Sequence, residues 1–362
     1  MRILSITIAI LGTAAMALAA RANDLPPTLL DRSEKTAEVR GLGGLDVDNS
    51  RGRVELRPST DGQLHVVATR VFRMGDAATA RRYAEQTSVQ CGPRGSRYAV
   101  DVRYPHRIET GVSFFDLFSE RGRGRFRLPS IEVILELRVP AGLPVHVTTA
   151  SGDVQASSLE GPLGVTVASG DVALSALRGE ATVQSASGDV ALQQVAAVRV
   201  RTMSGDVSAA GVGALDCETM SGDIEITGAR DSLVLGSQSG DLVVEDAPAG
   251  IRARSTSGEL DVRGACGRVS LETTSGEIRT RLRGPLRSAN LTSTSGDVGA
   301  ELVSGMGARL TAATTSGSID CSVPMTVSRH DRNRLEAMIG PGGPTLHMST
   351  VSGNLTVTSG GK

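Results

Sequence analysis

Residues 202–207 read TMSGDV and residues 219–224 read TMSGDI, and this repeated segment decides the fold. The Ser-Gly pair at its centre recurs every 17 to 21 residues along most of the chain. A unit of this length cannot bury a core alone, so each unit is expected to be one coil of a stack. The pairs begin at Ser151, Ser169, Ser187, Ser204, Ser221, Ser239, Ser257, Ser275, Ser295, Ser316 and, two periods later, Ser352.

Side chains alternate on both sides of each Ser-Gly pair, which is the pattern of a β-strand. The residues six and four positions before the serine are apolar in every coil, as Val198 and Val200 illustrate, and the alternation resumes three positions after it. Each coil therefore reads as strand, tight turn, strand and loose turn, with neighbouring coils paired in parallel about 4.8 Å apart. The pattern predicts an all-β fold: a right-handed parallel β-solenoid, or β-helix, of ~18-residue coils.

A small hydroxyl residue stands two positions before the turn serine in nearly every coil. Its phase is inward, so a column of Ser and Thr is expected inside the stack, with the hydroxyls bonded up and down. The column consists of Thr149, Ser185, Thr202, Thr219, Ser237, Ser255, Thr273, Ser293, Thr314 and Thr350.

The turn residues have a structural reason of their own. Glycine adopts the positive φ that a sharp corner requires, and the acid after it can bond to turn backbone. Stacked carboxylates about 4.8 Å apart repel one another, and a bound cation would relieve this, so a calcium-binding solenoid is the alternative function. Solvated turn residues are favoured, because only one turn per coil carries the acid. The candidate cation ligands are Asp153, Asp171, Asp189, Asp206, Asp223 and Asp241.

Every aromatic residue lies between Phe72 and Phe126, so the repeats must build their core from smaller side chains. Upstream, residues 45–56 fit the repeat template, with Arg51 and Arg53 in place of Ser and Asp, and predict an isolated first coil. The region between is expected to cap one end of the stack, because a free strand edge invites end-to-end pairing. It contains a predicted strand at 64–72, a helix at 77–90 capped by Asp76, and strands at 98–104 and 131–139.

Residues 1–22 have the features of a cleavable signal peptide: Arg2, an apolar stretch too short to span a membrane, and a small-residue cleavage site. No Cys lies near that site. We therefore expect a periplasmic or extracellular protein that is not a lipoprotein and has no transmembrane helix once mature. The remaining chain divides into an N-terminal coil and capping region at 23–140 with a Phe/Arg-rich loop at 105–129, solenoid repeats at 141–325, a charged and Gly/Pro loop at 326–345, and a final coil at 346–362 that closes the stack.

The repeats resemble those of the bacterial DUF4097 family, for which an adhesin role has been proposed. The resemblance rests on the two segments quoted first and on residues 349–355, which read STVSGNL after a Gly-rich loop. It covers most of the mature chain, and eleven copies in phase make it specific. The resemblance implies an envelope-associated β-helical fold and no assigned catalytic residue. Glu259 and Glu277 depart from the pattern by replacing Asp.

Four cysteines in an exported chain suggest disulfides, but their positions argue against pairing. Cys217 and Cys321 occupy inward positions many coils apart, Cys266 lies in a loose turn, and Cys91 lies outside the repeats. A disulfide needs Cα atoms closer than about 7 Å. We expect buried free thiols.

Enzymatic motifs are missing from the sequence. The five histidines are dispersed, and there is no HExxH, GxSxG or Walker lysine. The repeats carry no aromatic platform for a sugar, so a carbohydrate-active β-helix enzyme is a distant third possibility. The net charge of −1 gives no field that would favour nucleic acid. No catalytic residue and no cofactor other than calcium in the alternative is predicted.

The sequence favours a non-enzymatic, adhesin-like binding or structural protein. One outward face of the coils mixes basic, apolar and hydroxyl side chains, and the Phe/Arg-rich loop would either dock on an anionic membrane or a partner or fold over the solenoid end. The partner would be an envelope protein, a surface glycan or a second copy of the chain. The candidate contact residues are Arg199, Arg201, Met203, Met220, Arg252, Arg254 and Thr256 on the outward face, and Phe114, Phe115 and Phe118 in the loop.

Overall fold

A computed structural model describes residues 28–74, 76–105 and 130–360. The chain divides into two compact units, Met1–Thr166 and Val167–Lys362. The described residues are all-β with one short helix, and most of the strands pair in parallel, as predicted. The predicted signal peptide and the candidate contact residues Phe114, Phe115 and Phe118 lie outside the described residues.

The first unit contains the predicted isolated coil. Its strands β2 and β3 pair in parallel with β8 and β9, so that Leu45 lies opposite Val145 and Val54 opposite Val154. On their other edges β2 pairs with β6 and β3 with β7, also in parallel. The strands of this unit are β1 (Thr28–Ala37), β2 (Leu45–Asp48), β3 (Val54–Pro58), β4 (Leu64–Arg73), β5 (Ser88–Arg94), β6 (Arg97–Arg103), β7 (Ser130–Val139), β8 (Val145–Ser151) and β9 (Val154–Ser157).

Antiparallel strands continue both layers of this unit away from the coil. β4 pairs antiparallel with β7, β1 with β4, and β5 with β6. These pairings occupy the edges of β7 and β6 that would otherwise be free. Strands β1 and β5 are not predicted from the sequence, because neither alternates regularly between apolar and polar residues.

The single helix, α1 (Ala77–Gln86), begins where predicted. The side chain of Asp76 accepts a hydrogen bond from the Thr79 backbone N–H at 2.7 Å, which satisfies one free donor of the first turn. The helix ends four residues earlier than expected, because Thr87 is extended and the chain enters β5. Tyr83 packs with Phe72 and Ile131 in the one aromatic cluster of the described core.

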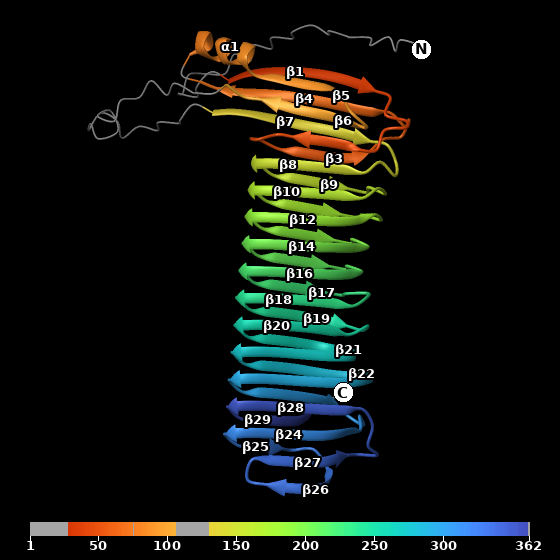
Figure 1. Cartoon of the computed structure of the whole chain (residues 1–362), viewed down its shortest axis with the longest axis vertical. Coiled ribbons are helices and arrows are strands. Elements are labelled where there is room, and N and C mark those ends of the chain that lie inside the picture. The colour runs from red at the N-terminus through yellow and green to blue at the C-terminus, as the bar shows by residue number, and fades with distance from the viewer. Residues whose placement is uncertain (1–27, 75, 106–129, 361–362) are drawn as a thin grey trace, which may run out of the picture. The chain divides into compact units, whose positions relative to one another are not determined.

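The second unit consists of stacked coils, drawn from yellow-green to blue in Figure 1. Its strands are β11 (Val172–Ser175), β12 (Glu180–Ser187), β13 (Val190–Gln193), β14 (Ala197–Ser204), β15 (Val207–Ala210), β16 (Ala214–Ser221), β17 (Ile224–Thr227), β18 (Leu233–Ser239), β19 (Leu242–Ala247), β20 (Ile251–Ser257), β21 (Leu260–Ser275), β22 (Ile278–Ser295), β23 (Val298–Val303), β24 (Ala308–Ser316), β25 (Ile319–Cys321), β26 (Met325–Asp331), β27 (Arg334–Ile339), β28 (Thr345–Ser352) and β29 (Leu355–Gly360); β10 (Leu163–Ser169) contains the boundary.

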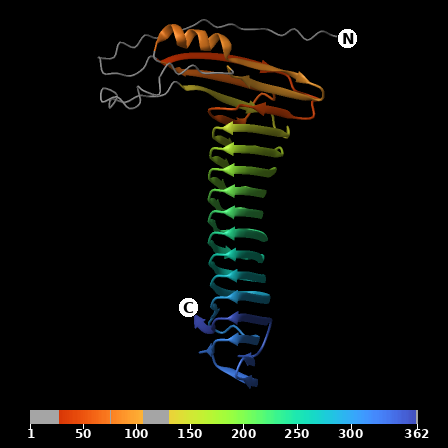
Figure 2. The ribbon, with the colours of Figure 1, turned by 60° about the vertical axis from the view of Figure 1, so that its left-hand side comes forward.

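Equivalent positions of the repeats lie directly opposite one another. Ser204 pairs with Ser221 and Val207 with Ile224, so the Ser-Gly turns form one edge of the stack. Figure 2 shows the strands of this unit in successive layers. The inward positions predicted from the alternation are buried except for Ile319 and Cys321 of β25, which are half-buried, and the core is one layer made mostly of Val, Leu, Ile and Ala side chains.

The predicted hydroxyl column is buried along its whole length, but its bonding differs from the prediction. The hydroxyls of Ser293, Thr314 and Thr350 donate to turn glycine carbonyls of neighbouring coils at 3.1–3.2 Å. Hydroxyls stacked at the strand spacing of about 4.8 Å are too far apart to bond to one another. Among the described residues, therefore, several have no hydrogen-bond partner at all: Thr149, Ser185, Thr219, Ser237, Ser255 and Thr273.

Replacing Thr219 with Val is expected to raise the free energy of unfolding by about 1 kcal/mol, because it removes a buried, unpartnered hydroxyl without changing the shape of the side chain. The matched control is Thr350→Val, at the same position of another coil, which loses a bond to the Gly296 carbonyl and should cost about 1 kcal/mol. Urea unfolding measures both. Equal losses for the two variants would show that Thr219 is bonded in solution.

The end of the second unit departs from the order of the chain. Strand β28 pairs in parallel with β22 on one side and with β24 on the other, and β29 likewise lies between β23 and β25. The final coil is therefore inside the stack, and the expectation that it closes the stack is wrong. Figure 1 shows β28 between β22 and β24.

Residues 326–345, expected to be a loop, mostly form a hairpin. β26 and β27 pair antiparallel, and β27 also pairs antiparallel with β24. The hairpin ends the parallel stack, since it takes the edge of β24 that a further coil would otherwise extend. The sequence predicted a loop here because this segment is charged. Most side chains of β26 are charged or polar because β26 is an exposed edge strand.

Candidate binding face

The contact strip is the outward face of strands β12, β14, β16, β18, β20, β21 and β22 in the second unit. It has three rows, which lie one, three and five positions before each turn serine, and each row crosses the coils. The first row contains Met203, Met220, Gln238, Thr256, Thr274 and Thr294. The second row contains Gln184, Arg201, Glu218, Gly236, Arg254, Glu272 and Thr292. The third row contains Arg199, Asp216, Val234, Arg252 and Ser270.

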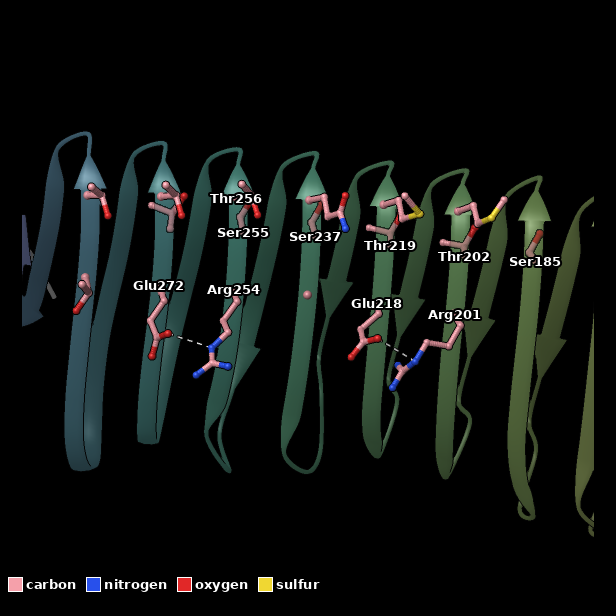
Figure 3. Close-up of a pocket in the computed structure, with 18 of the residues that line it drawn as sticks. Ser185, Arg201, Thr202, Glu218, Thr219, Ser237, Arg254, Ser255, Thr256 and Glu272 are labelled. Atoms are coloured by element: carbon pink, nitrogen blue, oxygen red, sulfur yellow. Dashed lines mark hydrogen bonds and ion pairs between the residues drawn. The ribbon is translucent and has the colours of Figure 1, made fainter.

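A groove of about 810 Å³ runs across the first two rows of the strip. Figure 3 shows its lining residues on successive strands. Gly236 lies at the centre of the second row and leaves a gap there, because it has no side chain. A Cβ at Gly236 would meet only the Glu218 side chain, at 3.4 Å, so the backbone does not require glycine here.

The charged residues of the strip form ion pairs between neighbouring coils. Arg201 lies 3.1 Å from Glu218 and 3.0 Å from Asp216, and Arg254 lies 3.0 Å from Glu272. The dashed lines in Figure 3 mark the Arg201–Glu218 and Arg254–Glu272 pairs. The hydrogen bond from Arg201 lowers the pKa of the Asp216 carboxyl below its usual range. Sequence reasoning selected the arginines and missed their acids, although Glu218 and Glu272 stand at the same phase of the next coil as Arg201 and Arg254.

The strip also presents unusual apolar exposure. Met203, Met220 and Val234 are 56%, 48% and 46% exposed, although side chains of this kind are normally buried. Arg252 is exposed and forms no ion pair with another described residue. Apolar side chains, hydroxyls and charges of both signs thus lie together on one flat face, as they do in protein interfaces.

The turn carboxylates bond to turn backbone, as predicted, but the backbone belongs to the neighbouring coil, which the sequence did not reveal. The Oδ1 atoms of successive turn Asp residues accept a hydrogen bond from the backbone N–H of the acid in the next turn: Asp171 from Asp189 at 3.0 Å, Asp189 from Asp206 at 3.0 Å, Asp206 from Asp223 at 2.9 Å, and Asp223 from Asp241 at 2.8 Å. Asn354 accepts in the same way from Ser318, at 3.0 Å. One oxygen per carboxylate is therefore already engaged in holding adjacent turns together.

The candidate cation ligands are not gathered into a cluster. In the part of the chain that the structure describes, no group of three or more His, Cys, Asp or Glu could hold a metal ion. Asp153 belongs to the first unit, where Arg53 approaches it at 4.0 Å. The remaining five stand in single file along the turn edge of the second unit.

The four cysteines are free thiols, but the expectation that all of them are buried is wrong for two. Cys217 and Cys266 are buried, whereas Cys91 and Cys321 are half-buried. Burial raises the pKa of Cys217 to about 12, so this thiol is neutral and part of the core. Cys266 was placed in a loose turn; it lies within β21, where its Sγ accepts a hydrogen bond from Arg283 at 3.4 Å.

The family model described as "Toastrack DUF4097" matches residues 137–210, 163–263 and 193–358. No curated protein matches the chain. None of the described helices is long and apolar enough to cross a membrane.

Solved bacterial structures resemble the chain at low identity. They include a "putative cell adhesion protein" from Clostridium sporogenes (8% identity, TM-score 0.21, covering 92% of this chain and 100% of that one) and a "putative adhesin" from Bacteroides fragilis (12%, 0.25, 91% and 97%). A third is a "putative lipid binding protein" from Parabacteroides distasonis (10%, 0.32, 90% and 96%). All three TM-scores lie below 0.5, so the function proposed below rests on the family and on the geometry of the chain itself.

Proposed function

Because the chain belongs to the toastrack DUF4097 family, we propose that it is an exported, non-enzymatic and adhesin-like protein of the cell envelope that binds through its contact strip. The proposal places the mature chain in the periplasm or outside the cell, without a lipid anchor. The family description names no reaction.

One observation carries this proposal: the strip combines exposed apolar side chains with paired charges on a rigid, flat face. Interfaces of non-obligate complexes have this mixed composition, and their Met and Arg content is higher than that of other surfaces. Met203 and Met220 lie side by side on neighbouring coils, with the Arg201–Glu218 pair in the adjoining row. A partner covering them would bury apolar surface that no described residue covers.

The proposal includes the finer architecture predicted from the repeats. Successive parallel pairings join residues 17 or 18 positions apart, such as Val207 with Ile224 and Ile224 with Leu242, which supports a coil of ~18 residues. We assign these coils a right-handed winding, since parallel crossover connections within a sheet are right-handed in nearly all proteins.

The test is attachment of the purified, fluorescently labelled mature protein to cells that produce it. A variant with Met203, Met220, Arg201 and Arg254 all changed to Ala should lose at least about tenfold in affinity, as expected when central interface residues are truncated. The matched control changes Ser208 and Glu225, outward residues of β15 and β17, to Ala. Undiminished attachment of the strip variant would sink the proposal.

A further inference from the structure

In the second row of the contact strip, residues at equal distances on either side of Gly236 carry opposite charges. Across five adjacent strands the row reads Arg201, Glu218, Gly236, Arg254, Glu272, each residue directly opposite the next in register. Read in reverse, the same row has an acid wherever the forward row has an arginine, and an arginine wherever it has an acid. A surface with this property is complementary to itself when one copy is turned end to end.

We infer that the contact strip binds the same strip of a second copy, face to face, with a two-fold axis lying along β18. This rests on the proposed function, because it names the partner of the same face. Such an axis keeps each row against its own row and reverses the order of coils. Arg201 then faces Glu272 of the second copy, Glu218 faces Arg254, and Gly236 faces Gly236, in an isologous interface.

The third row independently fits the same axis. Asp216 and Arg252 stand one coil before and one coil after Val234, so Asp216 faces Arg252 of the second copy. Arg252, which has no ion pair with a described residue of its own chain, gains one there. Val234, 46% exposed, lies on the axis and packs against its own counterpart.

The first row adds apolar burial in this arrangement. Met220 faces Thr256 of the second copy, and Met203 faces Thr274. Each methionine is thereby placed against a short hydroxyl side chain that leaves room for it, and Gln238 meets Gln238 on the axis, where two amides can exchange hydrogen bonds.

Two different two-fold axes could place these faces against each other: one along β18 and one along the stack. The pattern of charges favours the axis along β18. An axis running along the stack would keep the order of coils and set Arg201 against Arg201 and Glu218 against Glu218. Like charges in contact across an interface are unfavourable, whereas opposite charges both attract and fix the register. The existing pairs within each chain need not break, because an Arg guanidinium has five N–H donors and can contact two acids.

The extent of the strip predicts a weak and reversible dimer. Seven coils at about 4.8 Å give a length of about 29 Å, and three rows cover about 13 Å along the strands. An interface of this size belongs to the smallest class of specific contacts, with a dissociation constant on the order of micromolar.

The first experiment separates the charges into two complementary variants of the full mature chain. Arg201→Glu with Arg254→Glu makes the second row entirely acidic, and Glu218→Arg with Glu272→Arg makes it entirely basic. In sedimentation velocity, each variant alone should dimerise at least tenfold more weakly than wild type, and their mixture should recover dimer. Glu225→Arg, an exposed change on the opposite sheet, is the control and should dimerise like wild type.

The second experiment tests the order of coils by crosslinking with a short bismaleimide. Gln238→Cys should crosslink to itself, and a mixture of Met220→Cys with Thr256→Cys should crosslink as a heterodimer. Thr294→Cys should not crosslink to itself, because three coils separate it from the axis. Self-crosslinking of Thr294→Cys as strong as that of Gln238→Cys would overturn the axis, and wild type measures the contribution of the native thiols.

Failure of this inference can be distinguished from failure of the proposed function. A wild-type chain that stays monomeric well above micromolar concentration, while the alanine strip variant still loses cell attachment, overturns the dimer and leaves the binding face. If the charge variants and the crosslinks give the expected results but the alanine strip variant still attaches to cells, the dimer is supported and the proposed function is wrong.

Discussion

Gly222→Ala is expected to destabilise the second unit by about 3 kcal/mol or more. Gly222 has φ +146°, a conformation that side-chain-bearing residues rarely adopt, and a Cβ at this position would overlap the carbonyl group of Gly205 in the neighbouring turn. Backbone strain alone costs about 1–3 kcal/mol, and the overlap is with backbone that belongs to the preceding coil. The coils would have to separate at their turn edge.

Gly236→Ala is the matched control, since it adds the same methyl group one strand away. Its backbone does not have a positive φ, and the only close neighbour of the new Cβ is the flexible Glu218 side chain. We expect the free energy of unfolding of Gly236→Ala to stay within about 0.5 kcal/mol of the wild-type value. Urea unfolding compares the variants, and hydrogen exchange of the turn amides shows whether the loss starts at residues 205–222. Similar stabilities for both variants would contradict the close stacking of the turns.

Asp206→Ala should cost about 1–3 kcal/mol, because it leaves the backbone N–H of Asp223 without its acceptor between two turns. Asp206→Asn should lower the free energy of unfolding much less, since an amide oxygen can accept the same hydrogen bond. The chain already contains this solution at Asn354, which accepts from the Ser318 backbone. Urea unfolding of the two variants therefore separates the role of the acceptor from the role of the charge.

The same pair of variants tests the calcium alternative. If the turn acids held a cation, Asn would be nearly as damaging as Ala, and a chelator would lower the melting temperature of the wild-type chain. We expect neither effect, because each carboxylate places one oxygen on backbone and its neighbours stand in single file. A clear melting shift with chelator would restore the calcium site.

The fold was largely predictable because one short pattern is repeated in phase. Once the turn glycine is placed, alternation assigns Val198, Val200 and their equivalents to the core, and all of them are buried. The end of the second unit was not predictable in this way. Nothing in the alternation of residues 346–357 says which coil they pair with, since every coil offers the same edge. The structure places β28 between β22 and β24, after the hairpin strand β27 has paired with the other edge of β24.

The face on which the candidate residues lie was predictable from the sequence, but the ion pairs and hydrogen bonds between them were not. Outward phase located Arg201, Met203 and Met220 on one face, as the structure shows. The pairing of Arg201 with Asp216 and Glu218 depends on which coil lies beside which, a relation between residues that are 15 and 17 positions apart. A bond from turn backbone to Asp206 was expected, but for the same reason the sequence did not show that its donor belongs to the next turn.

The insertion of the last coil has a consequence for how the chain is made. Strands β24 and β25 are synthesised before β28 and β29. Among the described strands, however, they pair with the preceding coils only through β28 and β29, by the pairings of β28 with β24 and of β29 with β25. A chain that emerges from its N-terminus can add coils one by one only as far as β22 and β23. Residues 308–321 therefore cannot pair with the preceding coils until residues 345–360 have been synthesised and have paired with both.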